Sequence, residues 1–367
     1  MTERGHSPPD AIEACVALSL LRVGSDTKAA RLLVDLIRAD PSAGFAGVMD
    51  RLAEALEIPP LLRRSRIDQA WEGAARALED ARRAGLTVVP LGSDDYPVRL
   101  RWLPDPPTVL WVKGDPAALG RPAIAVVGSR AATPASVLVA RRLSRELAEA
   151  GLLVVSGLAR GIDGAAHDGA LEAGVTAAVL GCGADRIYPP EHRSLAARIA
   201  ARGAVASELP PGTPPLPRHF PLRNRIISGL SLGVLVVEAS FKSGSLITAR
   251  AGLEQGRAVM AVPGGIASGR HRGCHALIKD GARLVESVED VLDEVGWRAQ
   301  PPSAPALTKS LQISQLQGTM TVGEPYSVED LAARTGRATP ELLAELGGLE
   351  LAGRVARNPG GSYIRLD

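Results

Sequence analysis

Four short segments rich in glycine, serine and arginine hold the residues that could bind an anion. These segments are IAVVGSR (124–130), LVVSGLARGID (153–163), FPLRNRIISG (220–229) and VVEASFKSGSLITA (236–249). Each follows a short apolar run that is typical of a buried β-strand. In a parallel sheet such strands end at one edge, which is where open α/β sheets bind their ligands. The sequence therefore predicts a single anion-binding rim built from all four segments.

The backbone and side-chain groups of this rim suit phosphate. Glycine lets the main chain approach a ligand closely, and the N–H groups that open a helix attract anions. Arg130 follows the first strand of the domain and Lys242 precedes a helix, so each can bring a cation to the rim. The candidate binding residues in these turns are Gly128, Ser129, Arg130, Arg160, Lys242, Ser243, Gly244 and Ser245.

Residues 218–225 (RHFPLRNR) hold three arginines and no acid, with one of the chain's three phenylalanines among them. A basic loop with an interleaved aromatic suits single-stranded nucleic acid, because Arg223 and Arg225 would neutralise phosphate while Phe220 stacks on a base. The alternative is that Phe220 belongs to the core and the arginines form a solvated edge. The neighbouring Gly/Ser turns favour phosphate contact.

The sequence carries no signature of a dinucleotide site, an ATPase or a metalloenzyme. Residues 128–133 (GSRAAT) lack the glycines of a GxGxxG fingerprint, and the second strand ends in Ser156 rather than in the acid that holds a ribose. No Walker A sequence occurs, and Cys274 and His275 stand without further metal ligands. We therefore predict no catalytic residue, no metal and no cofactor.

Three polar residues near the rim have structural interpretations. We expect Asp163 to cap the helix that it opens and His167 to pack against the turns. We expect Glu238, at the end of a buried strand, to accept hydrogen bonds from the backbone of the Ser243–Ser245 turn. A nucleotide hydrolase is an alternative, because such enzymes also use glycine-rich turns and a strand-end glutamate. Their PGGxGTxxE signature is not matched by residues 263–270 (PGGIASGR).

Size and composition describe a chain of two or three domains with sizeable cores. The chain has 367 residues, 46% of them apolar, and a net charge of +2, so a nucleic-acid surface must be local. No apolar run approaches the ~18 residues of a membrane span. The N-terminus lacks the pattern of a secretory signal, and three cysteines show no metal or disulfide spacing. We expect a cytoplasmic protein without membrane contact.

The elements that must position the rim alternate as strands and helices from about residue 121 to 297. Their strands are apolar throughout, as in parallel sheets covered on both faces. We predict an α/β fold: a Rossmann-like doubly wound parallel sheet flanked by a small N-terminal helical domain and a C-terminal winged helix. The predicted domains are a helical (SAM-like) accessory domain (1–84), the Rossmann-like domain with the segment leading into it (85–297), a linker (298–317) and a winged-helix-like domain (318–367).

Neither flanking domain carries a strong DNA-binding signal of its own. Residues 21–33 bear a faint likeness to a helix–hairpin–helix DNA module but lack its glycine pair. Residues 318–367 contain seven acids and five arginines, which gives a net charge of −2. An acidic winged helix binds phosphate poorly, so we expect it to contact protein. A protein that acts mainly as an adaptor is therefore a second alternative.

Taken together, the motifs resemble the DNA-processing protein A (DprA/Smf) family of bacteria. The resemblance covers about 200 residues, with the motifs in order and at ordinary spacing. The matching stretches are DYP (95–97), VGSR (127–130), SGLARGID..AH (156–167), YP (188–189), SE (207–208), FPLRNRIISGLS (220–231), VVEA (236–239), SGSLITA (243–249), AVPG (261–264) and LIKDGA (277–282).

This resemblance implies a single-stranded DNA-binding protein of natural transformation. Members of the family protect incoming strands and help load a RecA-type recombinase onto them, usually as a homodimer formed through the Rossmann domain. The family is not known as an enzyme. The resemblance thus implies single-stranded DNA, a RecA-type recombinase and a second copy of the chain as partners.

The family's binding residues are assigned here position by position. Arg130 should contact phosphate, and Arg193 matches most nearly the basic residue that follows the YP turn. Lys242 is a further candidate on the opposite wall. One departure is ATPAS (132–136), where members commonly continue with a Tyr-Gly pair. The residues that correspond to the strand-binding pocket are Phe220, Arg223, Asn224 and Arg225.

Overall fold

A computed structural model gives the fold of most of the chain. It describes residues 11–21, 51, 53–54, 57–298, 316–351, 354–358 and 361–366. Nearly all of the predicted linker (298–317) lies outside the described residues, as do residues 22–33 of the segment that resembles a helix–hairpin–helix module. Within the described part, no helix is long and apolar enough to cross a membrane.

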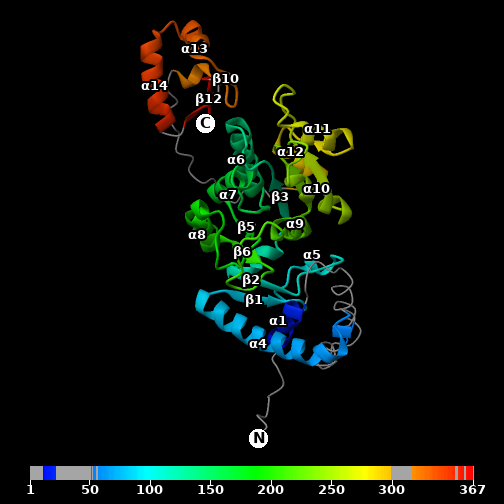
Figure 1. The fold of residues 1–367 in the computed structure, drawn as a ribbon. Helices are drawn as coiled ribbons and strands as arrows, with labels where there is room; N and C mark the ends of the chain where they lie inside the picture. Colours follow the sequence, from blue (N-terminus) through cyan, green and yellow to red (C-terminus); the bar gives the residue numbers. More distant parts are fainter. Residues whose placement is uncertain are drawn as a thin grey trace.

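The central element is a nine-stranded sheet with the order β1-β2-β6-β5-β4-β3-β7-β8-β9. Figure 1 shows β1, β2, β6, β5 and β3 of this sheet following one another through the middle of the molecule. All neighbouring strands from β6 to β9 along this order pair in parallel. The strands are β1 (Thr87–Pro90), β2 (Val109–Gly114), β3 (Ala123–Val127), β4 (Leu153–Ser156), β5 (Thr176–Val179), β6 (Ala204–Ser207), β7 (Gly233–Val236), β8 (Ala258–Ala261) and β9 (Arg283–Leu284).

Helices cover both faces of this sheet because its central strands are apolar on both faces. In β3, Ile124 and Val126 pack toward one face, and Ala125 and Val127 pack toward the other. The first face carries α6 (Pro134–Glu149), α7 (Ile162–Ala173), α8 (Arg193–Arg202) and α12 (Val288–Glu294). The second carries α5 (Val98–Arg101), α9 (His219–Leu230), α10 (Ser245–Glu254) and α11 (Arg272–Lys279). The predicted Rossmann-like doubly wound domain is confirmed.

The winding changes direction at β3. Its neighbours are β4 on one side and β7 on the other. The chain leaves β3 toward α6 on the first face, whereas it leaves β7 toward α10 on the second face. Connections that diverge in this way leave a crevice outside the carboxyl ends of the two strands. This switch point is where the predicted rim should gather.

One edge of the sheet departs from the wholly parallel prediction. β2 pairs antiparallel with both β1 and β6, so the segment that we expected to lead into the domain supplies two of its strands. Trp111 of β2 is fully buried and packs against the N-terminal helices. In the pairing of β2 with β6, Trp111 lies opposite Ser207, the last residue of β6. The sheet is therefore mixed, with an antiparallel edge.

The N-terminal helices pack on one face of this antiparallel part of the sheet. They are α1 (Ala11–Leu21) and α4 (Pro60–Ala84), which ends at Gly85 in the left-handed conformation (φ 65°). Alanines of α4 pack with apolar residues of α1 and with Val109 and Trp111 of β2 in one core cluster. The described part of the predicted helical domain thus shares its core with the sheet.

The C-terminal unit has the outline predicted for a winged helix. It contains α13 (Val328–Thr335), α14 (Thr339–Leu351) and a three-stranded sheet in the order β10-β12-β11. The strands are β10 (Pro325–Tyr326), β11 (Val355–Arg357) and β12 (Tyr363–Arg365). A capping box between Ser327 and Asp330 starts α13. Its core is formed around Leu331, Leu342 and Leu346, which are fully buried.

His167 lies in the middle of α7, where it is fully buried and its Nδ1 lies 2.7 Å from the Thr176 hydroxyl of β5. Its polar partner is therefore a residue of this strand, which our prediction of packing against the turns did not anticipate. Burial, together with the nearby charges of His192 and Arg223, lowers the pKa of His167 from 6.5 to about 3.

Because the His167 imidazole is buried, we expect the folded protein to lose stability in acid. A group whose folded pKa is depressed contributes stability that is present above its unfolded pKa and is lost as the pH falls toward the folded value. The free energy of unfolding should therefore decrease between pH 6.5 and about 3. The His167 contribution to this slope should be up to about 1.4 kcal/mol per pH unit. Urea denaturation of the wild type and of His167→Gln across this range measures it, and parallel curves would refute it.

Candidate nucleic-acid interface

A cavity of about 550 Å³ opens at the carboxyl ends of β3 and β7, at the switch point of the sheet. Residues from all four Gly/Ser/Arg segments contribute to its wall, so the structure brings the predicted rim together. The lining residues are Val127, Gly128, Ser129, Arg130, Ala131, Ala159, Asp163, Tyr188, Pro215, Pro217, Phe220, Pro221, Arg223, Asn224, Ile227, Ser240, Ser243, Gly244, Ser245, Ile247 and Thr248.

Three helices begin at this cavity. Asp163 lies in the first turn of α7, Phe220 and Pro221 lie in the first turn of α9, and Ser245 is the first residue of α10. The N-terminus of a helix presents free N–H groups and the positive end of its dipole. The cavity is therefore surrounded by groups that favour negative charge, apart from Asp163 itself.

Glycine is required where the turns after β3 and β4 touch. A Cβ on Gly128 would lie 2.5 Å from the Ile162 side chain, and one on Gly161 would lie 2.3 Å from the Ser129 carbonyl oxygen. Gly161 also has φ 72°, which L-residues rarely adopt. The Ile162 N–H donates to Ser129 O across this contact, at 3.2 Å. The close approach fixes the turn that carries Arg130.

An aromatic and cationic stack stands at the wall of the cavity. The guanidinium carbon of Arg130 lies 5.4 Å from the centroid of the Phe220 ring, and the ring of Tyr188 lies 5.7 Å from the same ring at 52°. Phe220 is half-buried against Gly181, whose added Cβ would lie 3.1 Å from the ring. Arg130 and Tyr188 are exposed. This arrangement offers a flat apolar surface next to an exposed cation, as base stacking requires.

Arg223 forms the floor of the cavity instead of a free phosphate-binding arm. It is buried, and its Nη1 donates to the carbonyl oxygens of Gly157 and Val179, at the ends of β4 and β5. Burial lowers the pKa of Arg223 to about 10, while the Asp163 carboxylate opposes this shift. The guanidinium lies on Gly157, where a Cβ would come within 2.5 Å of it.

Asp163 is the counter-charge of Arg223 and also holds the turn after β4. Its Oδ2 accepts the N–H groups of Gly157 (3.1 Å) and Ala159 (3.3 Å). Burial raises the pKa of Asp163, and the charge of Arg223 opposes that increase. The N-cap of α7 is Gly161, so our prediction that Asp163 caps this helix was wrong. Its hydrogen bonds go back to the preceding turn.

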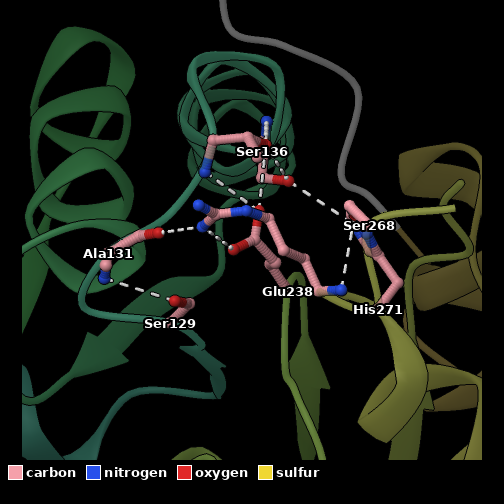
Figure 2. A network of polar contacts seen from close by, with 8 residues as sticks. Ser129, Ala131, Ser136, Glu238, Ser268 and His271 are labelled. Atoms are coloured by element: carbon pink, nitrogen blue, oxygen red, sulfur yellow. Dashed lines mark hydrogen bonds and ion pairs between the residues drawn. The ribbon is translucent and has the colours of Figure 1, made fainter. Parts of the chain in front are cut away.

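Glu238 lies two residues after the end of β7 and holds the turn that carries Arg130 from the other side (Figure 2). Its Oε2 accepts the N–H of Thr133 at 3.0 Å and the hydroxyl of Thr133 at 2.9 Å, and its own carbonyl accepts the Ser129 N–H at 2.7 Å. Arg270 donates to Ala131 O at 2.6 Å and lies 3.8 Å from Glu238 Oε1. We expected Glu238 to bond the Ser243–Ser245 turn, and the structure corrects this.

Most of the candidate residues lie at the cavity. Arg160 lines a small adjoining cavity of about 40 Å³ that shares Arg130, Tyr188 and Phe220 with it, and its guanidinium pairs with Glu191. The candidate residues in the wall of the main cavity are Gly128, Ser129, Arg130, Phe220, Arg223, Asn224, Ser243, Gly244 and Ser245.

Three candidate cations lie elsewhere. Arg225 faces a separate cavity of about 290 Å³, where it pairs with Asp105 at 2.7 Å and with Glu208 at 2.6 Å. Arg193 and Lys242 are exposed, and neither lines one of these described cavities. The basic segment that we interpreted as a loop is the first two turns of α9, so its arginines point to different faces.

Sequence reasoning missed Tyr188 and two of the prolines in the wall, Pro215 and Pro217. Tyr188 follows no strand directly, and its ring reaches Phe220 only through the folded chain. The signal that it carried was the YP pair (188–189), which we used only as a motif. Pro215 and Pro217 precede α9 in a proline-rich stretch without charge, where no chemistry pointed to a site.

The sheet order and the crevice define an open α/β protein with a cavity beyond the carboxyl ends of its strands, which is where proteins of this class bind their ligands. A family model described as DNA recombination-mediator protein A matches residues 87–296, and a model of the DprA winged helix domain matches residues 299–361. The chain belongs to this DNA recombination-mediator protein A (DprA/Smf) family.

Individual relatives agree with this assignment. The chain is 44% identical to protein Smf of Escherichia coli over 289 residues, which cover 76% of this chain and 77% of that protein. It is 39% identical to DNA processing protein DprA of Bacillus subtilis, over 78% of this chain and 97% of that protein.

Two solved structures of family members have the same fold. DNA processing protein A from Streptococcus pneumoniae superposes with a TM-score of 0.69 at 35% identity, over 78% of this chain and 98% of that chain. DNA processing protein A from Helicobacter pylori, whose structure was reported for its single-stranded DNA binding mode, superposes with a TM-score of 0.52 at 30% identity. That match covers 57% of this chain and 96% of that chain.

Proposed function

We propose that this protein binds single-stranded DNA in the cavity at the switch point and acts as a recombination mediator in natural transformation. The observation that carries this proposal is the stack of Arg130, Phe220 and Tyr188 beside the helix N-termini of α7, α9 and α10. Aromatic rings stack on any unpaired base, and arginine neutralises the phosphate next to it. The single-stranded DNA binding mode reported for the Helicobacter pylori relative supports the same conclusion.

In this proposal the cavity residues have separate roles. Arg130 contacts phosphate, and Phe220 and Tyr188 stack on a base. Asn224, in the second turn of α9, contributes its amide, which lies 3.5 Å from Gly244 O. Arg193 and Lys242 would extend the basic track outside the cavity. Arg225 would act indirectly, since its ion pairs with Asp105 and Glu208 hold α9 in place. In this proposal the protein binds DNA and catalyses no reaction.

The family resemblance supplies the proposed partners. We propose that a RecA-type recombinase receives the bound strand, that two copies of the chain associate, and that the protein works in the cytoplasm on strands that have entered the cell. A nucleotide hydrolase is the weaker candidate, because the Glu238 side chain is 1% exposed and is engaged by Thr133. Two copies side by side would raise the apparent affinity for long strands through effective concentration.

The proposal predicts a clear preference for single strands. Paired bases cannot reach a recessed ring, so duplex DNA of equal length should bind more weakly. Fluorescence anisotropy with labelled oligonucleotides across a salt series tests this. The logarithm of the affinity should fall with the logarithm of salt concentration, with a slope of about −0.7 for each phosphate contacted. Equal affinity for duplex and single strand, or no binding to either, would contradict the proposal.

A further inference from the structure

A second phenylalanine lies under an arginine at the same edge of the sheet. Phe241 is 61% exposed, and the guanidinium carbon of Arg272 lies 5.4 Å from the centroid of its ring. Arg130 lies at the same distance from the ring of Phe220. Phe241 thus belongs to no core, although burial is the usual location of so large an apolar ring.

The backbone fixes this second pair at the border of the cavity. Phe241 lies between Ser240 and Ser243, which both line the cavity. Arg272 begins α11, and the N–H of the next residue, Gly273, donates to Ala239 O at 2.7 Å. A Cβ on Gly273 would lie 2.8 Å from the carbonyl oxygens of Ala239 and Ser240, so the helix and the turn pack in direct contact. Main-chain packing therefore sets where the turn that carries Phe241 lies relative to the start of α11.

The charges around Phe241 indicate what it contacts. Lys242 is adjacent in the turn and Arg272 covers the ring, and neither cation forms an ion pair with an acid in the described part of the chain. A second copy of this chain that met the same patch across a two-fold axis would oppose like charges. A polyanion with exposed aromatic bases matches both the ring and the cations.

We propose that Phe241 and Arg272 form a second stacking platform, on which the same single strand continues after it leaves the cavity. This inference rests on the proposed function and extends it. Phe220 would stack on a base inside the cavity, and Phe241 would stack on a base further along the strand. The second platform contributes only when a strand is long enough to occupy the cavity and to reach beyond it.

The test is the affinity of Phe241→Ala for labelled single strands of increasing length, from about 6 to about 30 nucleotides. We expect long strands to lose about fivefold or more in affinity, and strands that fill only the cavity to lose nothing. Leu253→Ala is the matched control, since Leu253 is 59% exposed on α10 and does not line the cavity. In Phe241→Trp, long strands should quench the added indole fluorescence and short strands should not.

Several results would overturn this inference alone. Unchanged affinity at every length, or an equal loss at every length, would remove the length-dependent platform. A change from dimer to monomer in Phe241→Ala, measured by light scattering, would assign the ring to a contact between copies. If the wild type shows no preference for single strands, the proposed function itself fails, and this outcome is distinct because it precedes any comparison of variants.

Discussion

Phe220→Ala should lower the affinity for single-stranded DNA by about 5- to 140-fold. This range corresponds to the roughly 1–3 kcal/mol that one base gains by stacking on an aromatic side chain. The loss should lie toward the upper end, because the ring also supports Arg130 at 5.4 Å and Tyr188 at 5.7 Å. Without it, both side chains lose the surface that positions them at the wall of the cavity. Fluorescence anisotropy with one oligonucleotide at fixed salt measures the change.

Two further variants separate stacking from packing. Phe220→Leu keeps most of the apolar volume beside Gly181 but removes the π face, so its affinity should resemble that of Phe220→Ala. Leu222→Ala is the matched control on the same helix, because Leu222 is 38% exposed and faces the separate cavity with Arg225. If Phe220→Leu binds single strands as tightly as the wild type, Phe220 is a packing residue and the stacking role is wrong.

The sheet and the gathering of the rim could be predicted because both depend on local patterns. Apolar runs such as that of β3 identify strands buried on both faces, and the turns after such strands must meet at one edge. The sequence singled out Gly128 in the first turn, and the structure shows that Gly128 and Gly161 lie where two turns touch. The antiparallel edge was missed because β1 and β2 are separated by a turn-rich stretch, and nothing local indicates which strand they pair with.

Side-chain partners could not be predicted, because they depend on contacts between distant parts of the chain. Glu238 bonds Thr133, which lies 105 positions away, although a nearer turn offered equally suitable donors. Arg223 and Arg225 are two residues apart and therefore lie about 200° apart around a helix. One consequently reaches the cavity floor while the other reaches Asp105 and Glu208. Counting charges along the segment could therefore not distinguish Arg223 from Arg225.

The position of Arg223 in the floor leads to a stability prediction. Arg223→Met should lower the free energy of unfolding by about 3–5 kcal/mol, because it leaves the buried charge of Asp163 without the cation that offsets it. Asp163 is 6% exposed. The carbonyl oxygens of Gly157 and Val179 would also lose their donor. Urea denaturation at pH 7 measures the difference, and Arg223→Met combined with Asp163→Asn should recover part of it.

The pH dependence of the same variant identifies the mechanism. Burial already raises the pKa of Asp163, and loss of the opposing charge of Arg223 should raise it further. A group whose folded pKa lies above its unfolded value contributes stability at low pH that is lost as the pH rises through the folded value. The deficit of Arg223→Met relative to the wild type should therefore shrink as the pH falls and Asp163 takes up a proton. If the variant instead keeps the wild-type stability at every pH but binds single strands weakly, Arg223 is a direct phosphate ligand. Its contacts with Gly157 and Val179 then describe only its position before DNA binds.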